Sequence, residues 1–199
     1  SLRRSRQLNA KLPAGQAFVY LAAEHHEQGD LERAKRLYAR ATQMCREIGD
    51  RRWGAIAAGF QSVLLVETSD GPSVCTAARR AIAGLRKDGD TRLAAAFNAP
   101  LAAGEARQGE IARARGLLSR AQGEADGESD VVLSACLELG RALIEQADGG
   151  RASTPHYREK LETSIRVRIR LAARDINAAN QSHDLVQLAR LLLRLVSLG

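Results

Sequence analysis

Apolar and polar residues recur along this chain with the period of an α-helix, and short turn signals interrupt the pattern at regular intervals. Each signal is a glycine or serine followed by an acid, or once by a second glycine. The small residue lets the chain leave the helix, and the acid can cap the next one. The signals lie 20 residues apart, at Gly29-Asp30, Gly49-Asp50, Ser69-Asp70, Gly89-Asp90, Gly109-Glu110, Ser129-Asp130 and Gly149-Gly150. They predict eight consecutive helices.

Each interval holds a helix of about 25 Å, and connections this short place consecutive helices antiparallel. The unit is therefore a helical hairpin that repeats every 40 residues. In the first hairpin the apolar spacing predicts one buried face on each helix. The first face carries Phe18, Leu21, Ala22 and His25, and the second carries Leu31, Ala34, Leu37, Tyr38, Ala41 and Cys45.

The first hairpin has a large residue, a Leu-Ala pair and, after the turn, an Ala-aromatic-Ala series, at Phe18, Leu21, Ala22, Ala34, Tyr38 and Ala41. This pattern resembles the tetratricopeptide repeat (TPR) family. The period of 40 and the segment at 46–50 resemble its MalT-like and LGN-like forms. We expect the three alanines where the two helices cross, because larger side chains would separate them. The resemblance implies a partner-binding superhelix in a signalling or regulatory protein.

Later hairpins carry weaker versions of the same pattern. Its members are Trp53, Ile56, Ala57 and Phe60 in the second, Ala114, Leu118 and Ala121 in the third, and Cys136, Leu139, Gly140 and Leu143 in the fourth. Pro100 should kink or restart the first helix of the third hairpin. We therefore expect an all-α fold. Residues 13–179 would form a right-handed superhelix of about four antiparallel helix pairs, a TPR-like α-solenoid.

The two ends of the chain depart from the repeat. Residues 1–12 are expected to be the end of a preceding helix or an N-terminal extension, since a further turn would fall near position 10. The absence of an initiator Met favours a fragment of a longer chain. Residues 180–199 are expected to form a capping or interface helix, because their polar positions after Asp184 make one narrow stripe. Capping the last pair is the first interpretation, and pairing with another copy or with another domain is the alternative.

The formal charge of +7 is concentrated at both ends of the chain. Residues 151–199 hold nine Lys or Arg against four acids, whereas the middle of the chain is slightly acidic. This distribution argues against a nucleic-acid surface along the whole array. Arg166, Arg170 and Arg174 recur every four residues on an expected helix. They could form a basic docking face for an acidic protein segment or phosphate, or a solvated helix face.

Candidate chemistry is sparse. The chain has no glycine fingerprint, phosphate-binding loop, nucleophile elbow or HExxH motif. Adjacent His25 and His26 would point about 100° apart on a helix, so they cannot share a metal without further ligands. The three cysteines are expected to be reduced and buried. Without a signal peptide or membrane span, we expect a cytoplasmic protein that is not an enzyme and uses no cofactor or metal.

The TPR resemblance implies that the first helices of successive pairs line a groove for a protein or peptide. Val19 and Ala23 occupy the positions of a family carboxylate clamp, which argues against a chaperone-tail ligand. The candidate contact residues are Gln16, Tyr20, His26, Glu27 and Arg107, with Gln61, Arg141 and Glu145 where the register leaves alternatives. The leading hypothesis is a sensing or regulatory module of a larger bacterial signalling or transcription-regulating protein. The alternatives are nucleic-acid binding through the basic helix and self-assembly, as a homodimer, through the last helix.

Overall fold

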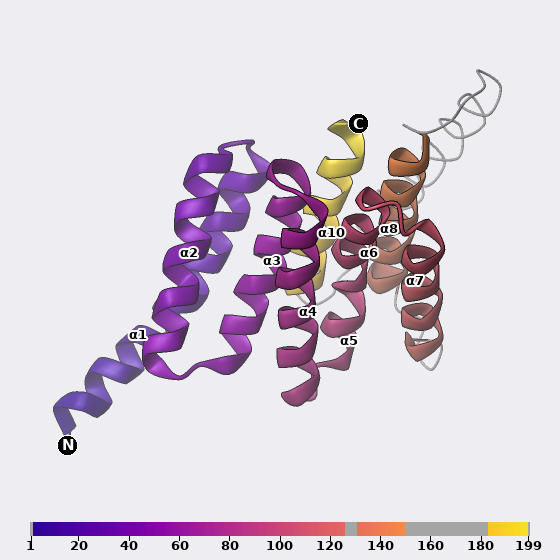
Figure 1. The fold of residues 1–199 in the computed structure, drawn as a ribbon. Helices are drawn as coiled ribbons and strands as arrows, with labels where there is room; N and C mark the ends of the chain where they lie inside the picture. Colours follow the sequence, from indigo (N-terminus) through magenta and orange to yellow (C-terminus); the bar gives the residue numbers. More distant parts are fainter. Residues whose placement is uncertain (1, 126–130, 150–182, 199) are drawn as a thin grey trace.

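A computed structural model describes residues 2–125, 131–149 and 183–198 of the chain (Figure 1). These residues form α-helices joined by short turns, and no strand occurs among them. The expected basic face of Arg166, Arg170 and Arg174 lies outside the described residues. The helices are α1 (Leu2–Glu27), α2 (Leu31–Ile48), α3 (Arg51–Thr68), α4 (Gly71–Lys87), α5 (Thr91–Ala96), α6 (Asn98–Arg107), α7 (Ile111–Ala125), α8 (Val131–Gly149) and α10 (His183–Leu198). The expected all-α class is confirmed for these residues.

The turns between the first helices have the capping chemistry that the sequence predicts. The carboxylates of Asp30, Asp50, Asp70 and Asp90 each accept a hydrogen bond, of 3.0 to 3.2 Å, from the backbone N–H three residues further on. Before three of these acids stands a glycine with a positive φ, the left-handed conformation in which other residues are strained. Helix boundaries here follow from local sequence.

The first helix of the third expected hairpin is broken, as Pro100 predicts. Helix α5 ends at Ala96, and α6 begins at Asn98 with Pro100 in its first turn. A proline ring clashes with the carbonyl four residues earlier, here that of Ala96, so one continuous helix is disfavoured. At the break Phe97 is fully buried.

Consecutive helices pack against one another and fold back at each turn, as Figure 1 shows for α1 to α4. Helices α1 and α2, α3 and α4, and α6 and α7 are close neighbours, and α2 with α3 and α4 with α6 join these pairs. The apolar core runs through all of them. Ala22, Ala34 and Ala41 have no exposed surface, which agrees with their expected place at the helix crossing.

Helix α1 differs from the expectation in two respects. It continues from Leu2 through position 10, where we expected a turn; residues 8–12 contain no glycine to end a helix. Its buried face is also displaced by about one residue. Val19, Ala23 and His26 are completely buried, whereas Leu21 is 39% exposed. Because α1 contacts α3 and α10 as well as α2, its buried side turns toward those helices.

Aromatic rings connect the helices inside the core. The His26 ring meets Tyr38 edge-on at 6.4 Å between centroids, and Tyr38 stacks with Phe60 at 6.4 Å. Phe60 in turn meets Phe97 edge-on at 5.9 Å. His26, rather than the expected His25, is therefore the histidine that packs with the core aromatics. The series links α1, α2 and α3 to the break between α5 and α6.

Candidate functional site

Helix α10 lies on the side of the molecule formed by the first helix of each expected pair. It packs most extensively against α8 and also contacts α1, α3 and α5, although the chain reaches it only after residue 182 (Figure 1). Leu188, Leu191 and Leu192 are completely buried there. Contact with α8 is what a helix that covers the last pair would make, whereas contact with α1 and α3 was not expected. The surface expected to receive a partner thus holds the chain's own last helix.

A polar cluster holds the N-terminal end of α10. The Tyr20 hydroxyl donates a 2.7 Å hydrogen bond to Asp184, and Arg52 lies 3.7 Å from the same carboxylate and 2.9 Å from Asp90. The Trp53 ring meets the Tyr20 ring edge-on, and the Arg52 guanidinium lies over the face of Trp53. Burial, with Asp184 as a second cause, raises the pKa of Tyr20 to about 12. Tyr20 therefore stays a hydroxyl donor at neutral pH.

A second set of polar contacts lies further along α10, at Gln187 and at Arg194. Arg194 donates a 2.7 Å hydrogen bond to Glu67, and Gln187 donates one of 2.9 Å to Glu27. The other Glu67 oxygen lies 3.2 Å from Nε2 of His26. Burial lowers the pKa of His26 to about 4, and the positive charge of Arg194 adds to this effect. His26 is thus neutral at pH 7, and its Nε2–H is the atom that can donate to Glu67.

The end of α10 is capped by a side chain from α8. Gln146 Nε2 donates a 2.7 Å hydrogen bond to the backbone carbonyl of Val196. This carbonyl belongs to the last turn of the helix, where carbonyls have no partner within the helix. The contact fixes where α10 ends relative to α8.

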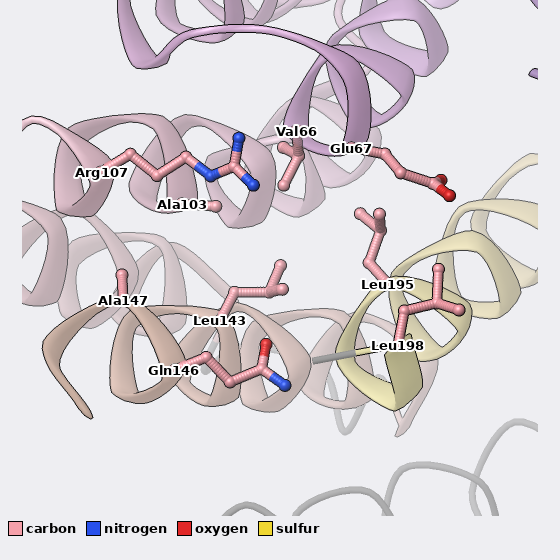
Figure 2. A pocket seen from close by; sticks show the side chains of 9 residues that line it. All are labelled: Val66, Glu67, Ala103, Arg107, Leu143, Gln146, Ala147, Leu195 and Leu198. Carbon is pink, nitrogen blue, oxygen red and sulfur yellow. The ribbon is translucent and has the colours of Figure 1, made fainter. Parts of the chain in front are cut away.

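Beyond this end, a hollow of about 340 Å³ remains open between α3, α6, α8 and α10. Figure 2 shows Leu143 and Leu195 pointing into it and Arg107 extending along one rim. Arg107 donates to the Ser69 carbonyl at 3.0 Å; within the described part of the chain its guanidinium meets this backbone oxygen rather than a carboxylate. The lining residues are Val66, Glu67, Ala103, Arg107, Leu143, Gln146, Ala147, Leu195 and Leu198. Most of the lining is apolar. Its polar members are Arg107 at the edge, Glu67, which already accepts from Arg194, and Gln146, which already donates to Val196.

The structure brings some of the predicted contact residues together and separates others. Tyr20 and Glu27 of α1 contact α10, and half-buried Gln16 also lies on α1. Arg107 lines the hollow. Gln61 is half-buried on α3, while Arg141 and Glu145 line a separate depression with Arg115 of α7. His26 is completely buried, so in this arrangement it is not available to a partner.

Sequence reasoning missed the residues that hold α10, namely Arg52, Glu67, Asp184, Gln187 and Arg194. One signal for them was present. Arg194 stands in a helix that is otherwise almost wholly apolar, and an arginine in a largely buried helix needs an acidic partner. Nothing local to residue 194 could identify that partner as Glu67, since the two are 127 residues apart.

No known protein family, curated protein or solved structure matches the chain. Among the helices that the structure describes, none is both long and apolar enough to cross a membrane. The same described ranges contain no group of three or more His, Cys, Asp or Glu residues placed to hold a metal ion. Contacts and charge around α10 are therefore the basis for a functional proposal.

Proposed function

We propose that this chain is a TPR-like helical-repeat scaffold that binds a helical segment of a partner protein on the face formed by the first helix of each pair. One observation carries the proposal: this face already accepts an amphipathic helix. Helix α10 buries leucines there and makes side-chain hydrogen bonds to α1 and α3. Burial of apolar residues with a few specific polar contacts is how helices are recognised in protein grooves.

The open hollow extends this face beyond α10 and is the part that a partner can reach directly. Its apolar floor, including Val66 and Leu143, suits one or two apolar side chains. Arg107 on the rim suits a neighbouring acid, because no described carboxylate neutralises it. The proposed partner segment therefore presents an apolar side chain next to an aspartate or glutamate.

A peptide-display selection against the chain of residues 1–199 tests this proposal. Enriched peptides should combine an apolar anchor with an acid, and Ala147→Trp, which fills the hollow, should abolish their binding. Arg107→Glu should weaken binding at least about tenfold. Ala112→Trp and Arg80→Glu change exposed residues outside the hollow and serve as matched controls. Equal binding to all four variants, or tight binding of a small molecule with no peptide enriched, would refute the proposal.

The wider role stays a prediction from the repeat resemblance: a non-enzymatic sensing or regulatory module within a larger bacterial protein. No second function is favoured by a specific contact. Self-assembly through the last helix would need its apolar face, and Leu188 and Leu192 are already buried within the chain. Nucleic-acid binding through Arg166, Arg170 and Arg174 rests on residues outside the described ranges.

A further inference from the structure

The face of α1 and α3 under α10 carries opposite charges at its two ends. At one end Tyr20 offers a hydroxyl donor, and Arg52 offers a cation 3.7 Å from Asp184 that it shares with Asp90 at 2.9 Å. Glu27 offers a carboxylate about one turn further along, at Gln187, and Glu67 offers one at the other end, at Arg194. A helix that lies on this face therefore meets a donor end and an acceptor end, and its direction matters.

Helix α10 presents matching groups in the matching order. Asp184, Gln187, Leu191 and Arg194 are spaced by three, four and three residues, which puts them on one side of a helix. Asp184 and Arg194, ten residues apart, are separated by about 15 Å along the axis. Asp184 meets the donor end, whereas Gln187 and Arg194 meet the two carboxylates. Leu191 is completely buried between them.

A helix bound in the opposite direction would bring its acid to Glu67 and its cation to Arg52. Like charges brought together in a partly buried site are unfavourable, and such repulsion is a common source of binding specificity. Glu67 and Arg194 are 16% and 22% exposed, so solvent screens this end of the face only in part.

We infer that this face selects a helix by the direction of its charges, taking an amphipathic helix with an acid in its first turn and a cation ten residues later. Helix α10 is then an internal ligand, and a partner helix with this pattern competes with it. This inference rests on the proposed function and states the partner's chemistry. Because α10 belongs to the same chain, its effective concentration is high, and a free helix competes poorly until α10 is weakened.

A charge swap within the chain of residues 1–199 tests the selection by direction. Arg52→Glu and Glu67→Lys together reverse the charges of the face. Asp184→Lys and Arg194→Glu together reverse the charges of α10 and give the helix-reversed chain. Hydrogen exchange then measures protection of residues 183–198 in the wild type, in each reversed chain and in the chain with both reversed. We expect each reversal alone to reduce protection at least about tenfold and the combination to restore most of it. Similar protection in all four chains, or no recovery in the fourth, would overturn selection by charge.

A second measurement tests binding of a separate helix. The probe is a labelled peptide with the sequence of residues 183–198, titrated by fluorescence anisotropy into the wild type and the helix-reversed chain. A matched peptide carries D184K and R194E. The native peptide should bind the helix-reversed chain at least about tenfold more tightly than the matched peptide does, and hardly bind the wild type.

The outcomes separate the two proposals. If both peptides bind the helix-reversed chain equally well, the face is a helix-binding site without charge selection, and this inference fails alone. If neither peptide binds although α10 has lost protection, both this inference and helix binding by the proposed scaffold fail. A thermal melt of each chain shows whether the rest of the fold is intact. The Arg80→Glu chain, which changes an exposed charge away from the face, is the control for this measurement.

Discussion

Arg194 in the last helix donates a 2.7 Å hydrogen bond to Glu67 in α3, and Glu67 also lies 3.2 Å from the buried ring of His26. One carboxylate thus connects α1, α3 and α10. Because Glu67 and Arg194 are only 16% and 22% exposed, solvent screens this contact less than it screens an ordinary surface ion pair, and loss of one partner would leave the other charge partly buried. The same contact bears on the stability of the chain, on its response to pH through His26 and on the proposed binding face.

Removal of the Arg194 charge should destabilise the chain. Arg194→Met keeps much of the apolar stem but leaves Glu67 with less compensation, so the free energy of unfolding should fall by about 1 to 2 kcal/mol. Urea unfolding measures the loss. Arg190→Met, four residues away on exposed surface, is the matched control and should change stability by less than about 0.5 kcal/mol. Equal effects of the two substitutions would show that the contact with Glu67 adds nothing.

His26 should make the chain less stable in acid. Its pKa is lowered from 6.5 in the unfolded chain to about 4 in the folded chain, mainly by burial. The unfolded state therefore binds more protons between these values. The contribution of neutral His26 to the free energy of unfolding is therefore fully present above pH 6.5. It declines as the pH falls toward 4, by at most about 3 kcal/mol.

Urea unfolding of the wild type and His26→Leu from pH 7.5 to pH 4 isolates this contribution, because the carboxylates titrate in both proteins. The wild-type curve should fall more steeply in acid, even though the variant loses the contact with Glu67 at every pH. Parallel curves would mean that His26 keeps an ordinary pKa.

Gly59 should not tolerate a side chain. A Cβ atom there would lie 2.2 Å from Cζ of Phe97, whose buried ring is also in contact with Phe60. Gly59→Ala should lower the free energy of unfolding by about 1 to 2 kcal/mol, despite the better helix propensity of alanine. Gly123→Ala, where a Cβ meets nothing within 4 Å, should raise it by up to about 1 kcal/mol. Thermal melts of both variants check the contrast, which would vanish if the Phe97 ring moves freely.

The three thiols should be protected while the chain is folded. Cys45, Cys75 and Cys136 are free and buried, and burial raises the pKa of Cys45 to about 11. A thiol reagent at pH 8 should react with them at least about a hundredfold more slowly than in urea, because reaction requires local opening. Prompt reaction of one thiol in the native chain would reveal an opening that this arrangement does not contain.

Local sequence alone determined the helices and most of their boundaries. Glycines with positive φ, aspartate caps and Pro100 act on neighbouring residues, so their effects can be read without knowing the fold. The buried alanines of the first hairpin follow from the same short-range spacing. The sequence also showed that α10 needs to be buried, since its polar residues are few.

Only the tertiary structure decided where α10 is buried and which side of α1 faces inward. Periodicity predicts the width of an apolar face, but the partners that cover it fix its rotation, and α3 and α10 turned it toward Val19 and His26. The pairing of Asp184 with Tyr20 and of Arg194 with Glu67 joins residues more than 100 positions apart. Contacts of that range depend on how all the intervening helices pack, which no local pattern specifies.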